Sequence, residues 1–185
     1  MLISPFQNIS KPSEKKLTII LLVSLIIMFL TMRYFDAPLK NTEAPSGIIS
    51  FEFAKELSKS EAILNSWNTL AKTSAGMSMG FDFLFLIIYA LFFALLIHKI
   101  NERLWKGLKI HTVGVLLIWC IFLAAFFDMV ENVALIKLLL GDLQQKWVSV
   151  AFYFAISKFF LLAIGFIFII VSLIFLLLKN KIVNN

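Results

Sequence analysis

Four long apolar runs, separated by segments rich in charged and polar residues, divide this chain. They cover about residues 17–34, 77–98, 112–140 and 147–178. A run of roughly 18 or more residues with few charges is typical of a helix that crosses a membrane. The pattern therefore predicts an all-α membrane protein, a four-transmembrane-helix bundle that residues 1–185 form as a single membrane domain.

The long segment between the first and second runs has a pattern of its own. Residues 44–47 read APSG, which is typical of a turn, and Ser58 and Glu61 have the spacing of a helix capping box. Apolar side chains then recur at helical period, at Ile63, Leu64, Trp67, Leu70 and Ala71. We expect an extracytoplasmic amphipathic helical segment over about residues 46–74, with Trp67 at the level of the lipid headgroups. Four roles are open to this segment: it rests on the membrane, covers the bundle, docks a partner or gates a substrate.

The connection between the third and fourth runs is short and reads GDLQQ. Gly141 suits the C-terminal end of a helix, and Asp142 with Gln145 has the spacing of an N-terminal cap for the next helix. Because so short a connection joins neighbouring helices of opposite direction, we expect the third and fourth spans to form an antiparallel pair.

Positive charge predicts the orientation in the membrane. It gathers before the first run, between the second and third, and after the fourth, at Lys11, Lys15, Lys16, Lys99, Arg103, Lys106, Lys109, Lys179 and Lys181. Lys and Arg in short loops mark the cytoplasmic side. We predict a multi-pass protein of the cell inner (cytoplasmic) membrane with both termini cytoplasmic. The first run begins like a signal peptide, but TMRYFDAP offers no small-x-small cleavage site, so an uncleaved span is expected.

The composition is typical of a membrane protein and limits the classes of partner that we expect. Of the residues, 61% are hydrophobic, and the net charge is +6. Since topology places most basic residues in such a protein, nucleic acid is not expected as a partner. The lipid bilayer is the expected partner, and a homo-oligomer or a larger membrane complex is open. One cysteine, Cys120, excludes a disulfide or a Cys-rich zinc site within one subunit, and no cofactor is predicted. His98 and His111 flank the basic connection and are expected to face the membrane interface.

Ionisable side chains interrupt the apolar runs at a common depth. At about 1.5 Å per residue, Asp82 and Asp128 lie roughly 24 Å from the cytoplasmic ends of their helices, and Glu131 and Lys158 roughly 28–30 Å. Arg33 reaches a similar level on the first span. A charged side chain that faces acyl chains costs several kcal/mol, which favours an inward orientation and mutual pairing. The sequence therefore predicts a polar chamber in the outer-leaflet half of the bundle.

The candidate ligand-binding residues of this chamber are Asp82, Tyr89, Asp128, Glu131, Asn132 and Lys158. An acidic chamber would bind a cation, a polar ligand or a lipid headgroup. An alternative is an intramembrane hydrolase, in which Asp82 and Asp128 share a proton or carboxylates hold a hard divalent metal through oxygen. Another is a purely structural buried network in an accessory membrane subunit. Whether the protein is an enzyme stays open at this point.

The same positions carry a resemblance to other proteins. The shared pattern is a Trp, then an Asp with a downstream Tyr, then Asp-x-x-Glu-Asn. In this chain it corresponds to Trp67, Asp82, Tyr89, Asp128, Glu131 and Asn132. This pattern resembles small bacterial four-span integral membrane proteins of unassigned function, over about residues 46–160. The resemblance implies the four-span fold and implies no activity.

Overall fold

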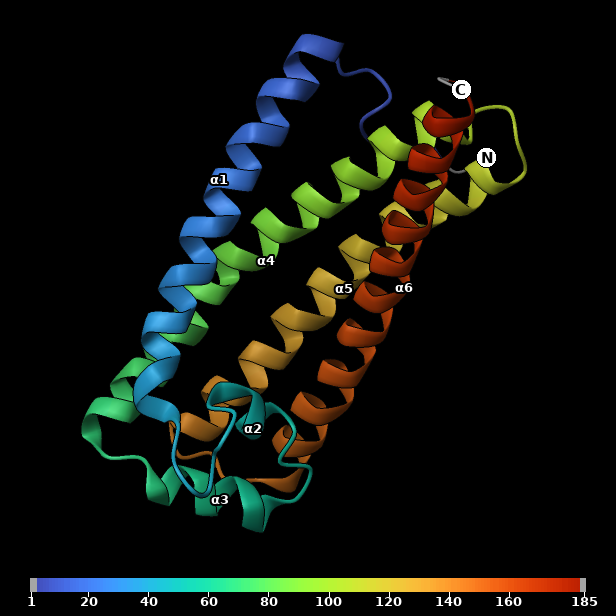
Figure 1. The fold of residues 1–185 in the computed structure, drawn as a ribbon. Helices are drawn as coiled ribbons and strands as arrows, with labels where there is room; N and C mark the ends of the chain where they lie inside the picture. Colours follow the sequence, from blue (N-terminus) through green and yellow to red (C-terminus); the bar gives the residue numbers. More distant parts are fainter. Residues whose placement is uncertain (1–2, 184–185) are drawn as a thin grey trace.

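Four long helices and three short ones make up the described part of the chain. A computed structural model describes residues 3–183, with side chains up to Leu178. The long helices are α1 (Lys11–Asp36), α4 (Thr69–Leu104), α5 (Ile110–Leu139) and α6 (Gln145–Val183) (Figure 1). The short ones are the 3-10 helix η1 (Ala37–Leu39), α2 (Ile48–Glu52) and α3 (Leu57–Ser66). Each long helix is long and apolar enough to cross a membrane, which confirms the predicted bundle of four transmembrane helices.

The long helices extend beyond the apolar runs. Helix α4 begins at Thr69, because the Asn68 side chain accepts a hydrogen bond from the Ala71 backbone N–H at 2.9 Å and caps the helix there. Hydrophobicity marks only the stretch that suits lipid, whereas helical hydrogen bonding continues through polar residues at either end. The side chains of Lys179 and Lys181, on which the predicted orientation partly rests, lie outside the described residues.

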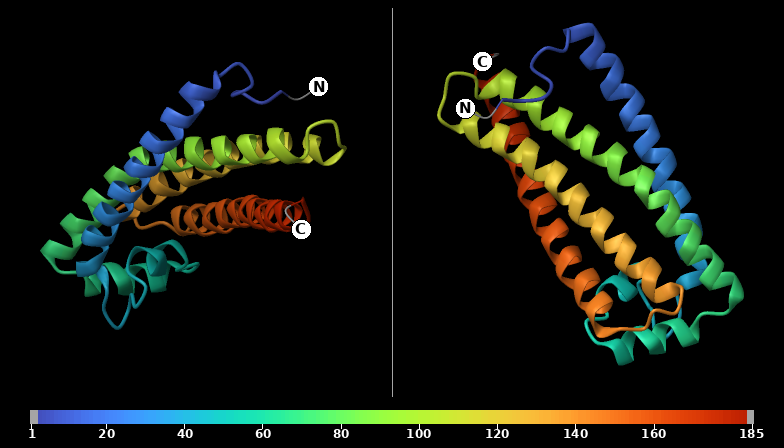
Figure 2. Two further views of the ribbon diagram at one scale, coloured as in Figure 1. Left: turned by 45° about the horizontal axis from the view of Figure 1, so that its top comes forward. Right: turned by 180° about the vertical axis from the view of Figure 1, so that it is seen from behind.

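Helix α4 is the centre of the bundle, since α1, α5 and α6 all pack against it. Helices α5 and α6 pack along each other as the predicted antiparallel pair, whereas α1 packs on α4 and stands apart from α6 (Figure 2). The described ends of the chain lie at one end of the bundle, and α2 and α3 lie at the other (Figure 1). This arrangement leaves one face of α4 between α1 and α6.

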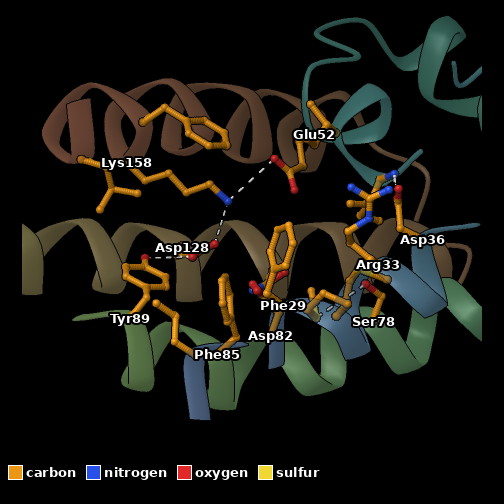
Figure 3. Close-up of a pocket in the computed structure, with 18 of the residues that line it drawn as sticks. Phe29, Arg33, Asp36, Glu52, Ser78, Asp82, Phe85, Tyr89, Asp128 and Lys158 are labelled. Carbon is orange, nitrogen blue, oxygen red and sulfur yellow. Dashed lines mark hydrogen bonds and ion pairs between the residues drawn. The ribbon is translucent and has the colours of Figure 1, made fainter. Parts of the chain in front are cut away.

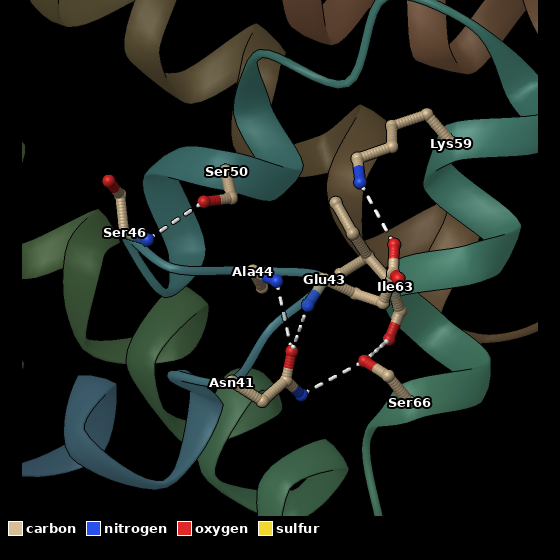
Figure 4. A network of polar contacts seen from close by, with 8 residues as sticks. All are labelled: Asn41, Glu43, Ala44, Ser46, Ser50, Lys59, Ile63 and Ser66. Carbon is tan, nitrogen blue, oxygen red and sulfur yellow. Dashed lines mark hydrogen bonds and ion pairs between the residues drawn. The ribbon is translucent and has the colours of Figure 1, made fainter.

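The segment between α1 and α4 folds into a compact cap over one end of the bundle. The Asn41 side chain accepts hydrogen bonds from the backbone N–H groups of Glu43 and Ala44, each at 2.9 Å, and donates to Ser66 Oγ at 2.9 Å (Figure 4). Lys59 Nζ lies 2.9 Å from Glu43 Oε2. These contacts fix the loop before α2 against α3.

The amphipathic helix predicted here is interrupted at Trp67. Helix α3 ends at Ser66 and α4 begins at Thr69, so Leu70 and Ala71 belong to α4. The Trp67 side chain is only 3% exposed, and its Nε1 donates to the Leu39 carbonyl at 2.9 Å. The expectation that Trp67 lies against headgroups is therefore wrong: the indole is buried in protein, where its N–H finds a backbone partner.

Two predicted helix caps are also wrong: a long-range contact with α6 replaces the first, and local side-chain contacts of Asp142 replace the second. Helix α3 begins at Leu57, and that backbone N–H donates to Oε1 of Gln145 in α6 at 2.8 Å rather than to a capping-box side chain. Asp142 accepts from Trp147 Nε1 at 2.7 Å and from the side chain of Gln144, and the indole bond lowers the pKa of the Asp142 carboxyl. Gly141 does end α5, with a φ of 94°.

Residues 3–9 fold back against the end of the bundle opposite the cap. Ser4 Oγ lies 2.9 Å from His98 Nδ1, and the Phe6 ring packs 5.8 Å from the imidazole. Trp119 Nε1 donates to the Ile3 carbonyl at 3.2 Å. His98 is only 5% exposed, so the expectation that it faces the membrane interface is wrong. The N-terminal segment covers it instead.

Candidate functional site

Lys158 of α6 lies at the centre of a buried charged cluster. Its Nζ is 2.7 Å from Asp128 Oδ1 and 2.8 Å from Glu131 Oε2, both on α5. Asp128 and Glu131 are three residues apart, which places both on the face of α5 that meets α6. The Glu131 side chain is fully buried, and the other two are nearly so. The predicted convergence of Asp128 and Lys158 is confirmed.

The remaining predicted residues join the cluster from α4 and α5. Tyr89 Oη donates to Asp128 Oδ2 at 2.9 Å, and Asn132 Nδ2 donates to Asp82 Oδ2. Asp82 and Tyr89 are seven residues apart on α4 and so share a face. Tyr89, Asp128, Glu131 and Lys158 therefore form one buried network between α4, α5 and α6, and Asp82 and Asn132 form a buried pair that lines the same cavity. Their role in binding stays a prediction.

Glu52 is the member of this network that sequence reasoning missed. It is the last residue of α2, it is buried, and its Oε2 lies 3.7 Å from Lys158 Nζ. The signal was present: Glu52 stands between Phe51 and Phe53, a lone carboxylate in an apolar stretch of an otherwise polar segment. A buried carboxylate needs a partner, and here Lys158 of α6 supplies it.

The start of α2 is held in place by the end of α1. Asp36 Oδ1 accepts a hydrogen bond from the Ile48 backbone N–H at 2.8 Å (Figure 3). Gly47, just before it, has a φ of 61°, a left-handed conformation that side chains other than glycine rarely adopt. Its position close to the Asp36 carboxylate leaves no room for a larger residue. This anchor directs α2 so that Glu52 reaches into the bundle.

A cavity of about 640 Å³ lies beside the network, between α1, α2, α4, α5 and α6. Polar side chains from all five surrounding helices line one end of it, and those of Glu52, Asp82, Asp128 and Lys158 face it together (Figure 3). Along the rest, the walls are apolar: Leu25, Ile26, Phe29, Phe85, Phe93, Leu162 and Phe166. The cavity is thus polar at one end and apolar over its remaining length.

The apolar part extends from the charged cluster toward the opposite end of the bundle. Phe93 follows Asp82 by eleven residues on α4, which corresponds to about 16 Å of helix. Phe166 follows Lys158 by eight residues on α6, or about 12 Å. Rim residues Ile26 and Phe29 are half exposed. Since α1 and α6 stand apart, the cavity opens sideways, toward the space that lipid occupies around a transmembrane bundle.

Negative charge predominates in the network. Three carboxyl groups, those of Glu52, Asp128 and Glu131, lie next to Lys158, the buried cation of the described residues, and the buried Asp82 carboxyl lines the same cavity. Burial raises the pKa of the Glu52 carboxyl, and the Lys158 charge opposes this effect. Glu52 Oε2 is buried and accepts no hydrogen bond from the described residues. The site therefore has unused capacity to accept hydrogen bonds and to bind positive charge.

Arg33 of α1 lines the same cavity but stands outside the network. Its side chain is exposed, and within the described residues no carboxylate lies within 4.0 Å of it. Arg33 therefore sits at the mouth of the cavity, between the charged cluster and the surroundings of the bundle.

The geometry bears on the chemistry that these side chains can perform. Both oxygens of Asp128 already accept hydrogen bonds, from Tyr89 and Lys158, and Asp82 is held by Asn132. Among the described residues, no group of three or more His, Cys, Asp and Glu side chains has the geometry to hold a metal ion. The arrangement is suited to binding an amine or another hydrogen-bond donor.

Comparison of the chain with models of protein families, with curated proteins and with solved structures gives no match. The sequence and geometry show a multi-pass membrane protein with four transmembrane helices and a buried charged network beside an amphipathic cavity.

Proposed function

We propose that this protein binds an amphipathic ligand, with a cationic amine head at the charged network and an apolar chain along the groove between α1 and α6. The observation that carries the proposal is the cavity itself, acidic at one end and lined by Leu, Ile and Phe along the rest. Its volume of about 640 Å³ lies in the range of ligand pockets, roughly 300–1,000 Å³.

The polar end of the cavity is better suited to bind an amine than an anion. The carboxylates there outnumber the cations, and Glu52 Oε2 has no hydrogen-bond donor within the described residues. An ammonium group supplies both the missing charge and several N–H donors. Asp82 is the residue through which we expect direct contact, because it lines the cavity and only one of its oxygens is engaged by Asn132.

The cavity also argues against a network that serves only to fix helix register. A register-fixing network has no need for an adjoining space of this size. In the proposed orientation, with both termini in the cytoplasm, the ligand's head lies in the outer-leaflet half of the cytoplasmic membrane and its chain extends toward the bilayer centre.

Purified protein in a neutral detergent tests the proposal by native mass spectrometry with three probes. Dodecylamine carries both features, dodecanol lacks the charge, and butylamine lacks the long chain. We expect dodecylamine to bind at least about tenfold more tightly than either of the others. The variant Asp82→Asn keeps a partner for Asn132 and should fold, yet should lose most of this preference for the amine.

The matched control is Glu56→Gln, which removes an exposed carboxylate from the same end of the molecule outside the cavity. It should bind dodecylamine as the unmodified protein does. Equal binding of dodecylamine and dodecanol, or an Asp82→Asn variant with unchanged preference, would show that the acidic end does not recognise an amine.

A further inference from the structure

A second cavity lies at the end of the bundle opposite the cap. Its volume is about 960 Å³, and it lies between the start of α1, the end of α4 and the C-terminal part of α6. Four cationic side chains line it: Lys11, Lys99, Arg103 and Lys106. Neither the candidate site nor the proposed function uses these residues.

Two of the four cations are already paired. Lys99 Nζ lies 3.6 Å from Glu14 Oε1, and Lys106 Nζ lies 3.1 Å from Glu102 Oε2. Lys11 and Arg103 have no carboxylate within 4.0 Å in the part of the chain that the structure describes. With both histidines neutral, the lining groups carry a surplus of two positive charges.

The wall of this cavity is a fixed structure rather than a loose terminus. The N-terminal segment that supplies Gln7 and Asn8 to the lining is anchored by the 2.9 Å contact of Ser4 with His98 and by the buried Phe6 ring. Across from it, Trp105 Nε1 donates to Ser172 Oγ at 3.0 Å and ties the end of α4 to α6. The free cations and amide donors therefore face one defined space.

Apolar side chains complete the lining. Leu96 and Leu104 come from α4, and Leu173 and Leu176 come from α6. These leucines line the same cavity as the cations, at the end of the bundle that the predicted topology places at the cytoplasmic membrane boundary. A guanidinium matches the oxygens of a phosphate in a two-point contact, and basic pockets between transmembrane helices hold anionic headgroups. A freely dissolved anion would gain nothing from the leucines, whereas a lipid uses both kinds of surface.

We propose that this cavity binds the phosphate group of an anionic phospholipid, with Arg103 and Lys11 as its direct ligands and the leucines against the start of the acyl chains. The inference is independent of the amine site at the other end of the bundle.

Native mass spectrometry of the delipidated full chain in neutral detergent tests this inference. The probes are phosphatidylglycerol, phosphatidylcholine and inorganic phosphate. We expect phosphatidylglycerol to bind about tenfold or more tightly than phosphatidylcholine, with a preference that falls as salt is added. Inorganic phosphate should compete only weakly. Equal affinity for the two lipids overturns the proposal, as does inorganic phosphate that binds as well as phosphatidylglycerol.

Substitutions at the lining cations test whether the lipid binds in this cavity. The double change Lys11→Gln and Arg103→Gln should remove most of the preference for phosphatidylglycerol, and Arg103→Lys should keep part of it. The control Lys40→Gln removes a cation from the cap and should leave lipid binding unchanged. Dodecylamine binding should survive the double change, which separates this site from the proposed amine site. An unchanged lipid preference in the double variant overturns the assignment; if that variant does not fold, the lipid comparison on the unmodified chain decides.

Discussion

Replacing Lys158 with Met is the most direct perturbation of the charged network. The ammonium lies 2.7 Å from Asp128 Oδ1 and 2.8 Å from Glu131 Oε2, with Glu52 Oε2 at 3.7 Å. Met fills a similar volume but leaves these carboxylates buried without a cation. Removal of one partner from a buried ion pair typically costs about 3–5 kcal/mol, and we expect the loss in free energy of unfolding to fall in that range.

A titration with dodecyl sulfate in mixed micelles, followed by helical circular dichroism, measures the free energy of unfolding. Lys137→Met, an exposed cation on α5, is the matched control and should change it by less than about 0.5 kcal/mol. Combining Lys158→Met with Asp128→Asn should cost less than the sum of the two single changes, by about 1–3 kcal/mol, because the second change removes a stranded charge. Additive costs, or a Lys158→Met variant as stable as the control, would refute the reasoning.

Further predictions concern single contacts. Tyr89→Phe removes the donor to Asp128 Oδ2 and should cost about 1.5–3 kcal/mol in the same titration, as expected for a hydrogen bond to a charged group. Trp67→Phe removes the donor to the Leu39 carbonyl, and an increase in hydrogen exchange confined to the cap should accompany a loss of about 1–3 kcal/mol. Burial raises the pKa of the Glu52 carboxyl above its ordinary value of 4.5. The docked cap is therefore most stable below pH 4.5, and its stability falls as the pH rises through the raised pKa of Glu52. Hydrogen exchange of residues 48–57, corrected for intrinsic rates, should show this trend, and Glu52→Gln should abolish it.

Much of the fold could be predicted from the sequence because lipid imposes a simple rule. Long apolar runs must become helices in a bilayer, where each backbone group needs an internal partner. The same rule makes a charge such as Asp128 or Lys158 costly toward lipid, so its inward direction could be predicted from depth and helical spacing alone. The ends of helices were less predictable. Helix α3 begins at Leu57 without the predicted Ser58 cap, and Asn68 starts a new helix, α4, inside the segment predicted as one.

The four transmembrane helices, the antiparallel pairing of α5 and α6, and the inward direction of the six polar residues could all be predicted from the order of residues. Three features emerge only when the chain packs: Glu52 of the cap reaches Lys158, Trp67 is buried with its N–H on the Leu39 carbonyl, and α1 and α6 stand apart beside the cavity. The reason is physical. Periodicity and hydrophobicity describe how a residue meets its near neighbours and its solvent, whereas these contacts join residues up to about a hundred positions apart, and only the packed chain brings them together.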